Sequence, residues 1–140
     1  MNKILIEIKK EIKENILPIY PFLRGYKIEI MKDNSEDDFY IFNNYLGCYE
    51  NESIFTGHAR IKLNLDECKL DCNKFGLSLY DTLLTTILHE IGHAIQDYFG
   101  YSYNEKQAED FAYFYWDFGT VLDLKNTKTK RNKNNLAQCF

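Results

Sequence analysis

The sequence lacks the features that would place the protein in a membrane or a secretory pathway. No stretch approaches the roughly 18 apolar residues that a membrane-spanning helix needs. Residues 1–17 mix Glu and Lys with apolar residues, whereas a signal peptide has an unbroken apolar run. The four cysteines have no framework-like spacing, so we expect reduced thiols. These absences predict a soluble, cytoplasmic protein with no membrane partner.

Several common catalytic and binding motifs are also missing. The chain has no internal repeat, no glycine-rich phosphate loop, and no Ser-His-Asp or Cys-His arrangement in a recognisable context. Its 140 residues suffice for one domain with a single core. We interpret residues 1–122 as that domain and residues 123–140 as a basic, disordered tail. Nucleic acid is a conceivable partner only for this tail.

The periodicity of the apolar residues predicts an α+β fold. Ile4, Ile8, Ile12 and Ile16 recur every four residues, which indicates an N-terminal amphipathic helix that ends before Pro18. Strand-like patterns follow at residues 25–31, 39–46 and 59–65. In the last of these, apolar residues alternate with polar ones, which predicts one buried and one exposed face. We expect a small antiparallel-type sheet, followed by two helices.

The first of these two helices carries the most informative motif, His89-Glu90-Ile91-Gly92-His93. Apolar residues at spacings of three and four predict a helix over residues 79–99, with a cap at Ser78 and Asp81 and a stop at Gly100. The two histidines are then one turn apart, so both rings can ligate one metal ion. The intervening glutamate borders the same face and can reach a water on that ion without ligating it.

The following helix supplies the missing third ligand. Asn104 and Gln107 are placed as a capping pair, so a helix should begin at Glu105. Glu109 lies one turn later on the same face. One of the two carboxylates can ligate the ion while the other accepts the second ring N–H of a ligand histidine. The residues alone leave both assignments open.

These two helices together resemble the gluzincin metallopeptidases. His-Glu-Ile-Gly-His followed by Glu-x-x-Ala-x-x-Phe-Ala is most similar to the small ImmA/IrrE-type proteins, and more distantly to the HtpX and CAAX prenyl protease groups. The resemblance covers residues 82–116 and implies a zincin-like domain with one Zn²⁺ on His89, His93 and Glu105, supported by Glu109. It also implies that the strand before the active-site helix has an exposed edge for substrate. Residues 58–66 are the candidate edge, although an ordinary surface strand fits equally well.

The expected function is hydrolysis of a peptide bond in a peptide or protein substrate. Glu90 would take the proton of a zinc-bound water and pass it to the leaving amine. The oxyanion needs a further donor, and the candidates are Tyr98, Tyr101 and Tyr103. The alternative is a regulatory protein of the ImmA/IrrE type, which engages a protein target and whose zinc site is structural or conditionally active.

Overall fold

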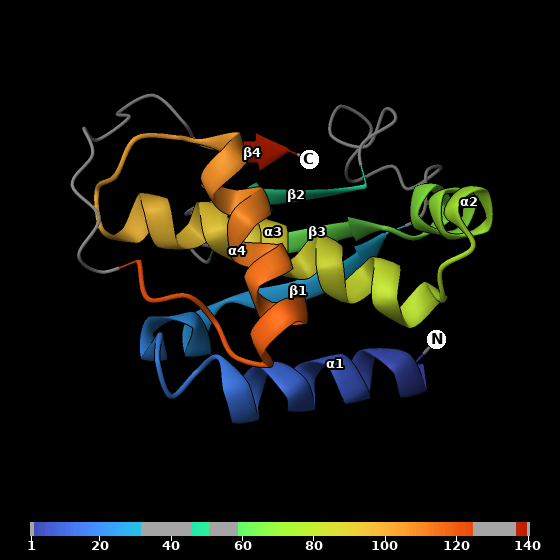
Figure 1. Ribbon diagram of the computed structural model, residues 1–140, viewed down its shortest axis with the longest axis horizontal. Helices are drawn as coiled ribbons and strands as arrows, with labels where there is room; N and C mark the ends of the chain where they lie inside the picture. Colours follow the sequence, from blue (N-terminus) through green and yellow to red (C-terminus); the bar gives the residue numbers. More distant parts are fainter. Residues whose placement is uncertain (1, 32–45, 51–58, 125–136, 140) are drawn as a thin grey trace.

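The computed structural model describes residues 2–31, 46–50, 59–124 and 137–139 and confirms an α+β architecture. Figure 1 labels the elements and colours them along the chain, and it shows the small sheet behind α3 and α4. They are α1 (Asn2–Asn15), a 3₁₀ turn η1 (Pro21–Gly25), β1 (Lys27–Met31), β2 (Gly47–Glu50), β3 (Arg60–Asn64), α2 (Leu65–Phe75), α3 (Leu79–Tyr98), α4 (Glu105–Phe118) and β4 (Ala137–Cys139). None of the described helices is both long and apolar enough to cross a bilayer.

The sheet is mixed, with the strand order β1-β3-β2-β4. β2 pairs antiparallel with β3 and with β4, but β1 and β3 are parallel. The prediction of an antiparallel-type sheet is therefore wrong for the β1–β3 pair. The reason is that β2 intervenes in the chain between them, so that the chain reverses direction twice. The predicted strand at residues 39–46 lies outside the described residues except for its last residue.

The strand β3 is internal, which corrects two predictions made for residues 58–66. It pairs with β1 on one side and with β2 on the other, so it offers no free edge for a substrate. Its expected exposed face is also covered, because Lys62 is only 1% exposed and Asn64 is fully buried. The side chain of Asn64 accepts a hydrogen bond of 3.1 Å from the backbone N–H of Glu67 and so caps α2. The helix α2 was not predicted, although this cap and Gly76 after its end are helix signals.

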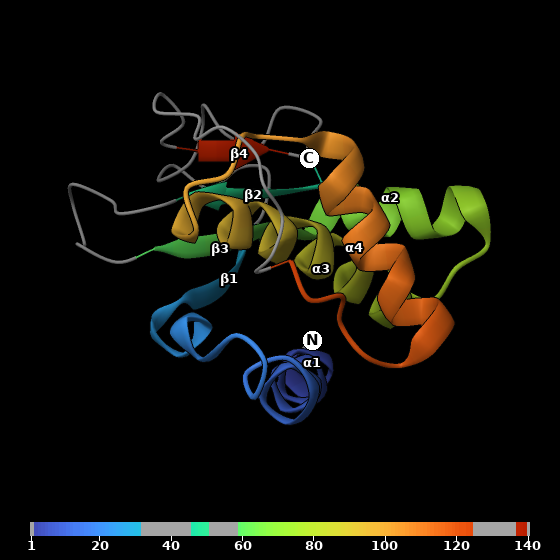
Figure 2. The same ribbon diagram turned by 60° about the vertical axis from the view of Figure 1, so that its left-hand side comes forward.

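The helix α3 forms the centre of the fold. It packs against β2 and β3 of the sheet and against α1, α2 and α4, and residues 86–96 are all buried. Figures 1 and 2 show α4 crossing α3 on the side away from the sheet, with α1 below both. The predicted helices are confirmed, including the caps, because Ser78 accepts from the N–H of Asp81 and Asn104 from that of Gln107.

The crossing of α3 and α4 depends on two small residues. A Cβ atom added at Gly92 would lie 2.9 Å from the Cα and 3.1 Å from the Cβ of Ala108. Such distances are shorter than van der Waals contact, so any larger side chain at this position would push the helices apart. The glycine inside the histidine motif thus allows the two helix backbones to touch.

The cysteines and the C-terminal segment differ from expectation. Cys48 is disulfide-bonded, which contradicts the prediction that all thiols are reduced. Cys68 and Cys72 are free and buried, and burial raises the pKa of Cys68 to about 12. Within the segment that we interpreted as a tail, residues 137–139 form β4 and extend the sheet. The boundary at residue 122 stays a prediction.

Candidate metal centre

His89, His93 and Glu105 converge where α3 meets the start of α4. Each offers a ligand atom, and the three atoms lie within 4.8 Å of one another. One carboxylate oxygen of Glu105 is 3.1 Å from Nε2 of His89, and the other is 2.7 Å from Nε2 of His93. Two nitrogens and a carboxylate oxygen are the donor set of catalytic zinc sites, so this group could hold a metal ion. The structure thus brings together the three residues that the resemblance implied.

The electrostatics of the three side chains suit a cation. Burial and, to a smaller extent, the neighbouring His93 lower the pKa of His89 to about 4, so the His89 ring is neutral at pH 7. Burial alone would raise the pKa of Glu105, but a hydrogen bond from the Tyr103 hydroxyl and the two histidines outweigh burial and lower it. The site therefore presents an unprotonated imidazole and a carboxylate, as metal ligation requires.

Gln96 fixes the orientation of His93 and was missed by the sequence analysis. Its Oε1 lies 2.9 Å from Nδ1 of His93, and its Nε2 donates to the carbonyl of Asn104 at 2.9 Å and to Oε1 of Gln107 at 2.8 Å. Because both amide protons are used, Oε1 must accept the Nδ1–H of His93. The lone pair of His93 is then on Nε2, which faces Glu105. The spacing of three residues from His93 on one helix was the available signal.

Glu109 does not occupy the supporting position that we predicted for it. Its side chain is exposed on α4, and it is not among the three residues that converge. Gln96 fills the equivalent role for His93. The reason is local: Gln96 comes from the ligand helix itself and points inward, whereas Glu109 lies on the outer face of α4.

Glu90 is buried beside the three converging residues. It is fully inaccessible, and neither carboxylate oxygen has a hydrogen bond of ordinary geometry to a described residue, although the backbone N–H of Tyr49 is near. Burial, and next the charge of Glu105, raise the pKa of Glu90 well above its usual value. A buried polar group without a partner is costly in a native structure. A water molecule on a metal ion at this centre would offer Glu90 a hydrogen-bond donor.

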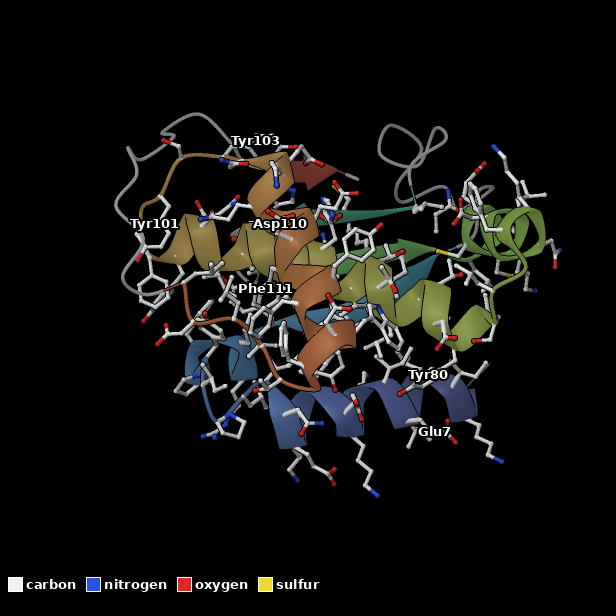
Figure 3. All side chains as sticks on the ribbon, viewed as in Figure 1. Glu7, Tyr80, Tyr101, Tyr103, Asp110 and Phe111 are labelled. Carbon is white, nitrogen blue, oxygen red and sulfur yellow. The ribbon has the colours of Figure 1, made fainter. Side chains whose placement is uncertain are left out.

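Of the three candidate tyrosines, only Tyr103 is at the centre. Its hydroxyl donates to Oε1 of Glu105, and its ring stacks on that of His93 with centroids 4.6 Å apart. Tyr98 instead stacks on Phe22, and Tyr101 packs against Phe99. Figure 3 shows Tyr101 beyond the end of α3 and Tyr103 near the start of α4. Of the three hydroxyls, the structure thus places that of Tyr103 beside the converging side chains.

A groove opens along the other end of the α3–α4 pair. It has a volume of about 620 Å³ and lies between α2, the start of α3 and the end of α4. Its walls include exposed aromatic side chains from α2 and α4 (Phe75, Tyr113 and Trp116). The indole N–H of Trp116 donates to the Thr85 hydroxyl at 2.9 Å and bridges the two helices at this end.

Comparisons with known proteins add no family assignment. No protein-family model matches the chain, and no curated protein or solved structure is significantly similar to it. The resemblance to the gluzincins therefore stays a prediction from the motif residues.

Proposed function

We propose that the protein is a zinc-dependent peptidase. The observation that carries this proposal is the placement of Glu90, a buried carboxyl group without a hydrogen bond of ordinary geometry, beside the His89, His93 and Glu105 group. A site that only held a metal for stability would have no use for such a group, because an unpartnered buried carboxyl destabilises the fold. In a peptidase, the Glu90 carboxylate would act as the general base that accepts a proton from the attacking water.

His89, His93 and Glu105 would hold the ion, and Gln96 would keep Nε2 of His93 directed at it. Bound zinc would lower the pKa of a coordinated water to about 7 and polarise the scissile carbonyl. Glu90 would accept the proton of the attacking water and then donate it to the leaving amine. Tyr103, whose hydroxyl is beside Glu105, is the candidate donor to the oxyanion.

Replacing Glu90 with Gln tests the proposal. The amide keeps the size of the side chain but cannot accept the proton, so we expect hydrolysis to fall by about 10²–10⁴-fold. Zinc content, measured by mass spectrometry of the purified protein, should not change, because Glu90 is not among the three converging residues. Hydrolysis is followed by mass spectrometry on an unfolded protein substrate.

Glu14→Gln is the matched control, because this glutamate is exposed on α1. It should retain full zinc content and full activity. Undiminished hydrolysis by Glu90→Gln would refute the role of Glu90. Zinc binding without hydrolysis in the wild type would favour the alternative, a regulatory protein that acts by engaging a target.

A further inference from the structure

The strand β2 runs along α3 past the candidate catalytic residue. A Cβ atom added at Gly47 would lie only 2.7 Å from Cγ2 of Thr86, one turn before Glu90. Two residues along β2, the backbone N–H of Tyr49 is near the carboxyl group of Glu90. The hydroxyl of Tyr49 donates to Asp97 at 2.8 Å, near the end of α3. β2 is therefore a strand that borders the candidate site, and it is the one that β4 pairs with.

The outer edge of β2 is occupied by the C-terminal strand of the same chain. β4 pairs antiparallel with β2, so that Cys139, Gln138 and Ala137 face Cys48, Tyr49 and Glu50. β4 also contacts α3. In Figures 1 and 2 it lies beside the start of α4, the turn that carries Glu105. Without β4, the edge of the sheet at the candidate site would be β2.

An exposed strand edge beside a peptidase site is a binding surface for an extended peptide, which can add to the sheet through its backbone. We infer that β4 occupies the position of such a peptide and that the C-terminal segment competes with substrate for β2. This inference rests on the proposed function, because it concerns the regulation of the same site. It also moves the substrate edge from β3, where the sequence analysis placed it, to β2.

Competition from within the chain has a specific kinetic signature. A segment tethered to the site acts at an effective concentration on the order of millimolar. It therefore raises the substrate concentration needed for half-maximal rate, while the rate at saturation is unchanged. A disulfide at β2 is relevant to this competition. Cys48 is disulfide-bonded, and it is paired with Cys139 of β4 in the backbone register, so a covalent bond at this position of β2 would favour the bound state of β4.

The first experiment compares Gln138→Pro with Gln138→Ala in the full-length, zinc-loaded protein. Proline at the middle residue of β4 removes an N–H and disrupts strand pairing, whereas alanine keeps the backbone intact. We expect Gln138→Pro to lower KM for an unstructured peptide substrate about tenfold with unchanged kcat. Gln138→Ala should behave as the wild type. Equal KM values for the wild type and Gln138→Pro would overturn the inference.

A second experiment uses the disulfide of Cys48 and does not depend on the proline variant. Cys48→Ser under non-reducing conditions should lower KM in the same direction, because the disulfide at β2 is lost. Cys72→Ser is the matched control, since Cys72 is a buried cysteine with a free thiol. An unchanged KM in Cys48→Ser would likewise overturn the inference.

A binding measurement separates failure of this inference from failure of the proposed function. A fluorescent synthetic peptide with the sequence of residues 134–140, with Ser in place of Cys139, is titrated into zinc-loaded proteins that carry Glu90→Gln. It should bind at least about tenfold more tightly when Gln138→Pro is also present. If the peptide binds more tightly in this way but the wild type hydrolyses no substrate, the proposed peptidase activity is refuted and the occupation of the β2 edge by β4 is supported. Equal peptide binding with normal hydrolysis would refute only the inference.

Discussion

The two ends of the α3–α4 pair differ in how the helices meet. At Gly92 and Ala108 the backbones are in contact, and the residues around the crossing are buried. Towards Thr85 and Trp116 the helices diverge and leave a groove of about 620 Å³ whose aromatic walls are partly exposed. At the Gly92–Ala108 end the helices are closely packed, and polar side chains hydrogen-bond across the interface. At the Thr85–Trp116 end the helices border an open groove whose walls are mostly apolar.

This difference shows what the close crossing contributes. Glu105 is in the first turn of α4, one turn before Ala108, so the contact between Gly92 and Ala108 sets its distance from the histidines of α3. Gln96 adds polar links from α3 to Asn104 and Gln107 at the same end. The three side chains that could hold a metal ion thus lie in the closely packed half of the interface.

The largest effect should come from removing a ligand at the closed end. Glu105→Ala deletes one of the three candidate ligands. Loss of a supporting group costs about 10–100-fold in metal affinity, and we expect the affinity for zinc to fall by more than this. Glu109→Ala, one turn along the same helix, should leave zinc affinity unchanged because its side chain is exposed and outside the group. Competition titration with a chromophoric chelator measures both. Zinc loss in Glu109→Ala but not in Glu105→Ala would reverse the ligand assignment.

Acid should destabilise the zinc-free protein through His89. The pKa of His89 is about 4 in the folded state, whereas an unperturbed histidine, as in the unfolded chain, has a pKa of 6.5. The unfolded chain therefore binds more protons than the folded protein between these two pH values. The contribution of His89 is complete above pH 6.5 and is lost as the pH falls to about 4, with a total of about 3 kcal/mol.

Urea unfolding at several pH values measures this contribution. Glu90 has a raised pKa, and its contribution to stability changes with pH in the opposite direction. The comparison is therefore between Glu90→Gln and the double variant Glu90→Gln/His89→Gln. The stability of the first relative to the second should decline from pH 6.5 to pH 4, and a difference that does not vary with pH would contradict the prediction.

Removing the amide that orients His93 should have an intermediate effect. Gln96→Leu leaves the Nδ1–H of His93 and the carbonyl of Asn104 without their partner, so zinc affinity should fall by about 10–100-fold. Thr85→Val removes the hydrogen bond to Trp116 at the open end and should leave zinc affinity unaltered. If the two variants bind zinc equally well, the polar links at the closed end do not support the site.

The smallest effect should come from widening the helix crossing. Gly92→Ala forces α4 to shift by a few tenths of an ångström, which should cost about 1–3 kcal/mol of stability and less than tenfold in zinc affinity. Gly25→Ala is the control, since a Cβ there meets nothing within 4 Å, and its unfolding free energy should change by less than about 0.5 kcal/mol. A stability equal to that of the wild type in Gly92→Ala would show that the crossing is not closely packed.

Much of the site was predictable because its parts are local. The histidines are one turn apart, and the caps at Ser78 and Asn104 directly precede their helices. The second cap places Glu105 in the first turn of its helix, whereas the choice of Glu105 over Glu109 came from the resemblance. The sheet was less predictable. The alternation in residues 59–65 indicated a strand. In such a short sequence, however, an internal strand that is covered on both faces cannot be distinguished from an edge strand with one exposed face.

The sequence by itself determined the pair of histidines, the glutamate between them and the helices that present them, because these depend on spacing within one or two turns. Only the tertiary structure decided that Glu90 is buried without an ordinary hydrogen bond, that Gln96 and not Glu109 contacts the His93 ring, and that β4 pairs with β2. Each of these results depends on groups brought together from different elements or on which face of a helix is covered. The periodicity of a single chain does not specify such contacts.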